Sequence, residues 1–161
     1  MREEELLKVK DLSFTYEEEP VLKNISLTVR HGEKIAVMGS NGAGKSTFFL
    51  NLNGVLKPDA GEIFLNGRKI GKKDMGLLRR QVGFVFQDAD SQIIASNVRA
   101  EISFGPMNLG LDRAEVIRRV DSAVSYLQLE ELQKRAPHYL SGGEKKRVSI
   151  AAVSYTHLRA H

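Results

Sequence analysis

Hydrophobic and polar residues alternate along the first third of the chain as they do in half-buried strands. Val9, Leu12 and Phe14 lie in one such run, and residues 22–29 form a second run of the same character. Side chains two residues apart return to the same face of a strand, so each run has one apolar face. The pattern predicts two antiparallel strands at the start of the chain.

Further strands are predicted by two short apolar runs and one turn sequence. Residues 34–38 form an apolar run closed by a glycine, and residues 81–86 form another. Between them, a glycine-rich stretch leads to a helical run that includes Phe48. Asn66-Gly67 is the strongest short hairpin-turn signal, because both residues tolerate positive φ. The first half therefore reads as strands around one loop and one helix.

The second half of the chain reads as helices. Asp112 and Glu115 have the spacing of a capping box, and hydrophobic residues follow at steps of three and four through Leu127. Ser141 and Glu144 repeat the capping spacing ahead of a last helix. We expect a boundary between the two halves near residue 88.

Composition limits the classes of protein that fit. The 161 residues include 24 Lys and Arg against 20 Asp and Glu, a net charge of +4, with 42% hydrophobic residues. These values favour one globular domain and exclude disordered and collagen-like chains. The absence of cysteine excludes a disulfide framework, a thiolate zinc site and a cysteine nucleophile. No apolar run approaches the roughly 18 residues of a membrane span, so we expect neither a membrane-spanning nor a secreted chain.

The glycine-rich stretch at residues 39–46 matches the phosphate-binding pattern G-x-x-x-x-G-K-[ST]. In such a loop, glycines let the backbone N–H groups approach anionic oxygens, and the following helix points its positive end at them. Lys45 would contact the β- and γ-phosphates of a nucleotide, Ser46 would bind Mg²⁺, and Thr47 would donate to a phosphate. A chance glycine-rich turn is the alternative, and a strand before and a helix after the loop argue against it.

A second motif lies at residues 140–147, where Ser141 precedes two glycines and Glu144. Two glycines in a first helical turn cost about 1 kcal/mol each relative to alanine, which suggests a compensating role. N–H groups without neighbouring side chains at a helix N-terminus can form an anion site. A plainly capped helix remains the alternative, since Ser141 and Glu144 alone explain a cap.

Together the two motifs resemble the nucleotide-binding domains of ABC (ATP-binding cassette) transporters. The family signature Leu-Ser-Gly-Gly-Gln reads Leu-Ser-Gly-Gly-Glu at residues 140–144, and Ser141 follows Lys45 by 96 residues. The resemblance implies an α/β fold of the P-loop NTPase type. It would have an antiparallel β subdomain, a RecA-like core and a helical subdomain, and would be incomplete at its C-terminus.

The resemblance also implies a division of the chain and a set of site residues. A partial ABC domain would occupy residues 1–153, divided into 1–88 (β subdomain and P-loop core), 89–140 (helical subdomain) and 141–153 (signature helix), followed by a tail, 154–161, that does not match. The expected ATP-binding residues are Tyr16, which would stack on adenine, Gly39, Ser40, Asn41, Gly42, Ala43, Gly44, Lys45, Ser46, Thr47 and Gln87. Ser46 and Gln87 would hold Mg²⁺. Ser141, Gly142, Gly143 and Glu144 would act on ATP bound by a partner subunit.

Two further segments point to a branch of the family. Residues 86–94 and 104–111 are similar to those of the energy-coupling factor and cobalt/nickel importers. The resemblance implies an ATP-binding subunit for prokaryotic uptake of a vitamin or metal ion, with ATP and Mg²⁺ as cofactors. It would lie peripherally on the cytoplasmic face of the membrane. Its partners would be a second ATP-binding subunit in a homo- or heterodimer, a transmembrane coupling subunit and a substrate-binding membrane subunit, and no nucleic acid is expected.

The chain departs from the family pattern after the signature. The family places a hydrophobic strand ending in Asp-Glu (Walker B) about twenty residues later, followed by a switch histidine, and the sequence contains no Asp-Glu pair. His157 and His161 lie too close to the signature to take the histidine's place. We therefore expect a chain cut short that binds ATP and hydrolyses it feebly or not at all, although the complete protein would be an ATPase.

Two other functions fit both motifs. A soluble ABC ATPase acting on nucleic acid or ribosomes shares them, although the importer-like residues 87–111 disfavour it. A non-catalytic nucleotide-binding module is the other, because it would not need the missing Asp-Glu pair.

Overall fold

The secondary structure changes from mainly strands to helices near the middle of the chain. A computed structural model describes residues 5–157 and divides the chain into two units, which meet in the sequence between Val82 and Gly83. The boundary expected from the sequence lies near residue 88. The first unit contains β1 (Glu5–Tyr16), β2 (Glu19–Arg30), α1 (Lys45–Leu52), β3 (Ala60–Leu65), β4 (Arg68–Lys69), the 3-10 turn η1 (Lys72–Asp74) and α2 (Met75–Gln81). The second contains α3 (Val98–Asn108), α4 (Arg113–Tyr126), the turns η2 (Glu130–Leu132) and η3 (Pro137–Tyr139), and α5 (Gly142–His157).

The first unit is built on an antiparallel sheet whose strand order is β2-β1-β3-β4. The predicted pairing of the first two strands is confirmed, with Val9 opposite Leu27 and Phe14 opposite Leu22. Between Val9 and Leu12 the register shifts, and Asp11 adopts a positive φ of 49°. This bulge explains why two buried side chains of one face lie three residues apart rather than two.

The hairpin predicted at Asn66-Gly67 is also confirmed. Asn66 and Gly67 have φ values of 50° and 75°, and they link β3 to β4. Two consecutive positive φ values are the geometry of the two-residue turns that match the twist of paired strands.

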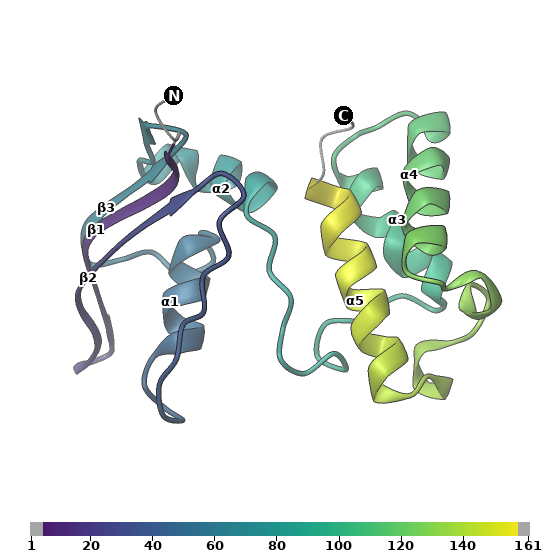
Figure 1. Ribbon diagram of the computed structural model, residues 1–161, viewed down its shortest axis with the longest axis horizontal. Helices are drawn as coiled ribbons and strands as arrows, with labels where there is room; N and C mark the ends of the chain where they lie inside the picture. The colour runs from purple at the N-terminus through teal and green to yellow at the C-terminus, as the bar shows by residue number, and fades with distance from the viewer. Residues whose placement is uncertain (1–4, 158–161) are drawn as a thin grey trace. The chain divides into compact units, whose positions relative to one another are not determined.

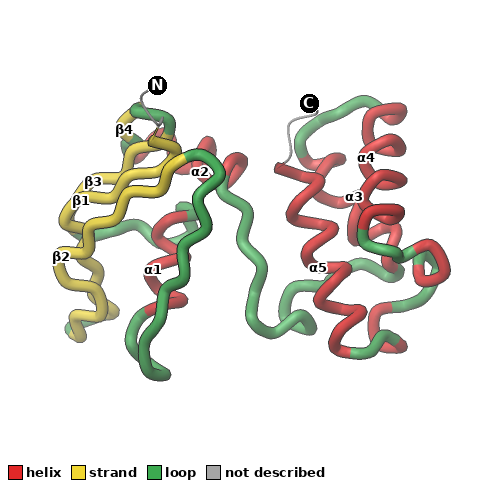
Figure 2. Tube along the Cα trace, in the orientation of Figure 1, coloured by secondary structure: helices red, strands yellow, loops and turns green. Residues whose placement is uncertain are grey.

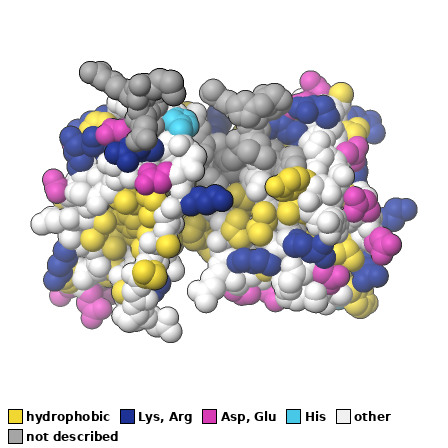
Figure 3. All heavy atoms as spheres, viewed as in Figure 1, with side chains coloured by type: hydrophobic (Ala, Val, Ile, Leu, Met, Phe, Trp, Pro, Cys, Tyr) yellow, Lys and Arg dark blue, Asp and Glu magenta, His cyan; other side chains and the backbone are white. Residues whose placement is uncertain are grey.

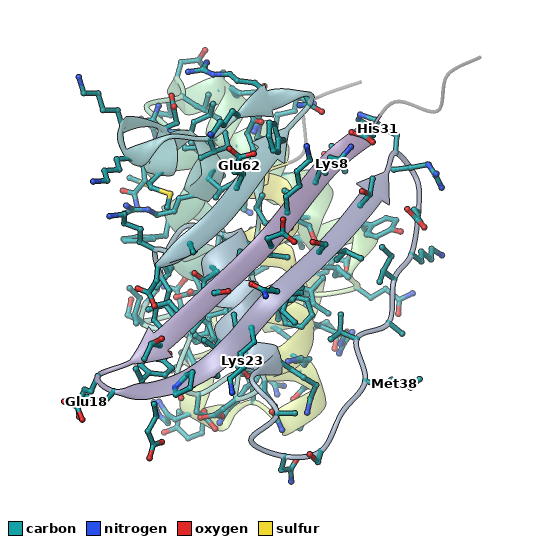
Figure 4. The ribbon with its side chains drawn as sticks, turned by 90° about the vertical axis from the view of Figure 1, so that its left-hand side faces the viewer. Lys8, Glu18, Lys23, His31, Met38 and Glu62 are labelled. Carbon is teal, nitrogen blue, oxygen red and sulfur yellow. The ribbon has the colours of Figure 1, made fainter. Side chains whose placement is uncertain are left out.

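The two buried strands predicted at residues 34–38 and 81–86 were wrong. Figure 2 shows residues 31–44 as a continuous loop, and residues 83–86 have no strand pairing either. Met38 is 89% exposed and points away from the ribbon in Figure 4. A strand is stabilised by hydrogen bonds to a neighbouring strand. Among residues 5–157 the only sheet is the four-stranded one, and neither run pairs with it.

Helix α1 packs on one face of the sheet (Figure 1). Phe48 and Leu52 of the helix join strand residues such as Leu12 and Ile63 in one buried cluster. Leu78 of α2, fully buried, belongs to the same cluster. This core fixes the start of α1, and with it the end of the glycine-rich loop, against the sheet.

The second unit is a bundle of α3, α4 and α5 with its own core. Asp112 caps α4 by accepting a hydrogen bond from the Glu115 N–H at 2.9 Å, as predicted. Within α4 the predicted stripe lies inward, and Val120 and Ala123 are buried against Val148 of α5 in the same cluster.

Hydrophobic side chains also reach the surface of the first unit (Figure 3). Val37, Met38 and Val55 are among those exposed. A hollow of about 280 Å³ lies beside the loop, lined by residues of β2, the loop and α1 that include Leu27, Val37 and Phe48.

No helix within residues 5–157 combines the length and the apolar character that crossing a membrane requires.

Candidate functional site

The glycine-rich loop turns sharply into α1. The Ala43 N–H donates to the Ser40 carbonyl at 3.2 Å, which closes a turn inside the loop. Gly42 and Gly44 both have φ of 84°, a left-handed conformation that glycine adopts without strain. The φ of Gly39 is not positive. The predicted helix start near Lys45 is confirmed, and we call residues 39–47 the phosphate loop.

Gly44 fits closely against the second strand. A Cβ atom added there would lie 3.0 Å from Val21 Cγ1 and 3.1 Å from Leu22 Cδ2. A Cβ added at Gly42 would meet nothing within 4 Å, so that side of the loop is open. The loop is therefore anchored at Gly44 and accessible at Gly42.

The polar groups of the loop fit a polyphosphate. The first turn of α1 leaves the N–H groups of Lys45, Ser46 and Thr47 without intrahelical acceptors, and no side chain caps them. The Lys45 ammonium lies across the loop and donates to the carbonyls of Gly39 at 2.7 Å and Ser40 at 2.6 Å. An anion placed at the loop would meet this cation and the free N–H groups together.

The two hydroxyl residues at the end of the loop, Ser46 and Thr47, differ in solvent exposure. Ser46 is exposed, so its oxygen is accessible to a cation. Thr47 is buried, and its carbonyl accepts a hydrogen bond from the Asn51 side chain at 2.8 Å. No group of three or more His, Cys, Asp or Glu side chains among the described residues could hold a metal by itself. A magnesium ion here would therefore need oxygens from a nucleotide as well as from Ser46.

Tyr16 lies in the same unit as the phosphate loop, at the end of β1. It pairs with Glu19 across the β1–β2 hairpin, two residues before the Val21 that contacts Gly44. The Tyr16 ring is 45% exposed and packs edge-on against Phe14 with 4.8 Å between ring centroids. Its exposed face is available for stacking.

The signature segment (residues 140–144) forms the N-terminus of α5. Both halves of the predicted capping box are present: the Ser141 N–H donates to Glu144 Oε2 at 2.7 Å, and the Glu144 N–H donates to Ser141 Oγ at 3.3 Å. The bonds from Ser141 lower the pKa of Glu144 from its ordinary value of 4.5. Gly142 and Gly143 are exposed, and Cβ atoms added there would meet nothing within 4 Å, so the surface beside the first turn of α5 is open.

Gln87 lies in the second unit with the signature segment. Its side chain is exposed and its carbonyl accepts a hydrogen bond from Lys146 of α5 at 3.3 Å. The phosphate loop and Tyr16 thus share one unit, and Gln87 and residues 141–144 share the other. The side chain of His157 and all of His161 lie outside the described residues.

Sequence reasoning missed three side chains that hold the segment around Gln87. Lys145 and Lys146 on α5 both bind it, and the buried carboxylate of Glu101 on α3 accepts the N–H groups of Ile94 and Ala95, which follow it in the chain. Two consecutive lysines directly after a capped first turn were a visible signal for the first two. A glutamate inside an apolar helical run was the signal for the third.

Comparison with known proteins places these motifs in one family. The family model described as ABC transporter matches residues 22–159. The energy-coupling factor transporter ATP-binding protein EcfA of Methanothermobacter thermautotrophicus is 46% identical over 151 residues, which make up 92% of this chain and 49% of that protein. EcfA of Methanoculleus marisnigri is 48% identical over 149 residues, 92% of this chain and 54% of that protein. The chain thus spans about half the length of the curated relatives it matches.

A solved structure agrees with these matches. CbiO1 from Clostridium perfringens, described as part of the ABC transporter complex CbiONQ, superimposes with a TM-score of 0.84 at 40% sequence identity, over 96% of this chain and 62% of that one. The antiparallel sheet with its helices is therefore the ABC-type P-loop NTPase fold in part. Sequence, site and fold agree that this chain belongs to the ABC transporter family and carries part of its ATP-binding domain.

Proposed function

We propose that the protein is the ATP-binding subunit of a prokaryotic membrane importer and couples ATP binding and hydrolysis to uptake of a vitamin or metal ion. Its relatives are named as ATP-binding proteins of energy-coupling factor transporters. These names favour a transporter subunit over an ATPase that acts on nucleic acid or ribosomes.

The observation that carries the proposal is the phosphate loop at the start of α1. Gly42 and Gly44 have positive φ, the first turn of α1 has free N–H groups, and the Lys45 ammonium lies across a loop that is open at Gly42. In our proposal, Lys45 exchanges the Gly39 and Ser40 carbonyls for the β- and γ-phosphates of ATP. The N–H groups of the loop bind the remaining phosphate oxygens.

Other residues would complete the nucleotide site. Tyr16 would stack on the adenine through its exposed ring face. Ser46 and Gln87 would hold Mg²⁺, which supplies positive charge at the phosphates. Residues 141–144 would bind the γ-phosphate of ATP held by a second ATP-binding subunit, because two N–H groups at a helix N-terminus favour an anion.

The residues needed to bind ATP and those needed to hydrolyse it are considered separately in this proposal. The 161 residues contain no Asp-Glu pair to orient an attacking water. The proposed hydrolysis therefore belongs to the complete protein, and we expect these 161 residues alone to bind MgATP and to hydrolyse it feebly or not at all. Residues 1–88, 89–140 and 141–153 would act as the β subdomain with phosphate loop, the helical subdomain and the signature helix.

The proposed partners follow from the same assignment. A second ATP-binding subunit would complete two sites in a homo- or heterodimer. A transmembrane coupling subunit and a substrate-binding membrane subunit would hold the pair at the cytoplasmic face of the membrane. ATP would close the pair, and hydrolysis would release it.

Binding of a fluorescent ATP analogue in the presence of Mg²⁺ tests the proposal. Lys45→Ala removes the cation of the loop and is expected to weaken binding by about a hundredfold, as loss of two charge-assisted hydrogen bonds would. Lys57→Ala, at an exposed lysine just beyond α1, is the matched control and is expected to bind as the unaltered chain does. Equal binding by both variants would refute the proposed site.

A further inference from the structure

Two consecutive lysines of α5 hold the segment that contains Gln87. The Lys146 ammonium donates to the carbonyls of Phe86 at 2.5 Å and Gln87 at 3.3 Å. Lys145 pairs with Asp90 at 2.5 Å, and its side chain is only 15% exposed. All of these residues belong to the second unit. The helix that begins at the signature segment is therefore tied at two points to a short stretch around Gln87.

The stretch itself, which we call the Gln87 loop (residues 86–92), is closed by its own hydrogen bonds. The Phe86 N–H donates to Gln92 Oε1 at 3.0 Å, across the base of the loop. Asp88 accepts from the Asp90 N–H at 3.1 Å and from the Ser91 hydroxyl at 2.6 Å. These hydrogen bonds restrain both the base and the tip of the loop.

The chain beyond the Gln87 loop is anchored to a different helix. Glu101 of α3 is 6% exposed and accepts from the N–H groups of Ile94 at 3.0 Å and Ala95 at 2.9 Å. The Gln87 loop thus lies between an anchor on α3 and a clamp on α5. Only the clamp on α5 reaches the backbone of Gln87 itself.

The two lysines are not equivalent. Lys146 makes charge-assisted bonds to neighbouring backbone carbonyls, which are present whatever side chains the loop carries. Lys145 instead pairs with a carboxylate that is 69% exposed, where solvent and salt weaken the attraction. Lys146 is also only five residues from Ser141, roughly 7 Å along the helix axis. Lys145 lies at a similar distance, four residues from Ser141, but its partner is the exposed carboxylate. A displacement of the signature segment would therefore reach the loop mainly through the backbone bonds of Lys146.

We propose that Lys146 is a positioning residue that fixes the backbone of Gln87 to α5, so that the Gln87 loop follows the signature segment when that segment binds nucleotide. This inference rests on the proposed function, which gives Ser141 a partner's ATP and gives Gln87 the contact with Mg²⁺. Lys146 touches neither nucleotide nor metal in this scheme. Lys146 would transmit a displacement of the signature segment, caused by nucleotide binding, to the Gln87 loop.

Hydrogen exchange of the purified chain, followed by mass spectrometry, tests the clamp. In Lys146→Met, which keeps the apolar stem and removes the ammonium, exchange in residues 86–92 is expected to rise at least about tenfold. This is the factor that one charge-assisted hydrogen bond supplies, here the short bond to Phe86, and the 3.3 Å bond to Gln87 adds less. Exchange in residues 148–151 of α5 should not change. Lys146→Arg restores a cationic donor and should restore slow exchange. Lys145→Met, which removes only the pair with Asp90, is the matched control and should change exchange less than threefold.

Three results would overturn the clamp. Unchanged exchange in residues 86–92 of Lys146→Met would show that the ammonium does not hold the loop. An equal rise across α5 would show general loss of stability instead of a lost clamp. Failure of Lys146→Arg to restore slow exchange would show that the ammonium's hydrogen bonds are not what matters.

Addition of MgATP separates this inference from the proposed function. The phosphate loop of the unaltered chain should become protected, and when two chains pair, α5 and the Gln87 loop should become protected together. In Lys146→Met the protection of α5 should remain and that of the Gln87 loop should disappear; if both remain, the coupling is refuted. If MgATP never protects the phosphate loop, the proposed function fails, while the exchange of residues 86–92 without nucleotide still decides the clamp.

A measurement on the unaltered chain covers the case in which Lys146→Met does not fold. Acetic anhydride acetylates free amines, so an ammonium engaged with two carbonyls should react about tenfold more slowly than the exposed Lys134. Acetylation keeps the stem and removes the charge. Equal reaction rates at Lys146 and Lys134 would overturn the proposal.

Discussion

Two glycines of the phosphate loop share one backbone conformation but differ in their surroundings, which lets strain and crowding be separated. Gly42 and Gly44 both have φ of 84°, and a side chain in this region costs about 1–2 kcal/mol. Only at Gly44 would a Cβ atom also press on Val21 and Leu22. We expect Gly42→Ala to lower the free energy of unfolding by about 1 kcal/mol and Gly44→Ala to lower it by at least about 2 kcal/mol. Urea unfolding of both variants measures the difference.

The crowding at Gly44 also bears on nucleotide binding. Displacement of Val21 would shift β2 away from α1, whose first turn carries Lys45. We expect Gly44→Ala to weaken MgATP binding more than Gly42→Ala does. Equal losses of stability in the two variants would show that the contact with Val21 does not constrain the loop.

The structural role of a residue was predictable from the sequence where a local motif determines that role. The phosphate-loop glycines and the capping pair Ser141 and Glu144 lie within a few residues of the groups they serve, so spacing alone revealed them. Lys146 and Glu101 could not be assigned in this way. Lys146 binds a carbonyl 60 residues away, and the sequence does not show which distant backbone group a lysine will reach.

Among the elements, α5 depends on an ionised carboxylate at its first turn. The pKa of Glu144 is lower in the folded chain than its ordinary value of 4.5, because Ser141 donates hydrogen bonds to it. Ionisation of Glu144 therefore favours folding at pH above 4.5, and this contribution is lost as the pH falls through the lowered pKa. Glu144→Gln can still complete a capping box but does not titrate. We expect its urea midpoint to fall less than that of the unaltered chain on acidification from pH 6 to about pH 3.

The result of this experiment is the difference in urea midpoint between Glu144→Gln and the unaltered chain, because other carboxylates also titrate between pH 6 and about pH 3. Hydrogen bonds from Arg118 and Arg119 hold the pKa of Glu115 at about 2, and the Ser91 hydroxyl lowers that of Asp88. These groups are present in both proteins, so their contributions cancel. Parallel curves for the two proteins would show that the capping carboxylate does not contribute to the acid sensitivity.

The start of α3 depends on the buried carboxylate of Glu101. Glu101→Ala would leave the N–H groups of Ile94 and Ala95 without an acceptor, and we expect a loss of about 2 kcal/mol in the free energy of unfolding. Glu131→Ala, at an exposed glutamate of the same unit, should change it by less than about 0.5 kcal/mol. Urea unfolding monitored by circular dichroism measures both. Equal stability of the two variants would show that the N–H groups of Ile94 and Ala95 donate to water and do not need the Glu101 carboxylate.

For the whole molecule, the two wrong strand predictions have one cause. Residues 34–38 and 81–86 carry the composition of buried strands, yet a strand is formed by its neighbours as well as by its own residues. The β1–β2 and β3–β4 pairs are linked by short turns, so each of these strands has one neighbour close in sequence, and the distant pairing of β1 with β3 then joins the two hairpins. Residues 34–38 have no such neighbour within the described chain, and Met38 lies exposed instead. Local pattern was therefore sufficient for hairpins and capped helices but not for runs that have no pairing strand close in sequence.

Assembly is the property of the whole molecule that the signature segment should control. In the proposed function, Ser141 and the N–H groups after it receive a phosphate from a second subunit. Ser141→Arg would fill that position with a long side chain and remove the cap, while the phosphate loop remains intact in the other unit. We expect MgATP binding to change less than threefold, because a nucleotide bound at the phosphate loop meets none of the substituted atoms. ATP-dependent pairing, measured by analytical ultracentrifugation with a non-hydrolysable ATP analogue, should be lost.

Ser141→Ala separates the lost cap from the blocked phosphate site. It removes the hydroxyl that accepts the Glu144 N–H, which costs about 1 kcal/mol of stability, but it leaves Gly142 and Gly143 open. We expect this variant to pair with reduced affinity, whereas Ser141→Arg should remain monomeric at every analogue concentration. If Ser141→Arg pairs as the unaltered chain does, the N-terminus of α5 does not receive the partner's phosphate. If both variants fail to bind nucleotide, the effect lies in folding and the role assigned to the signature segment is wrong.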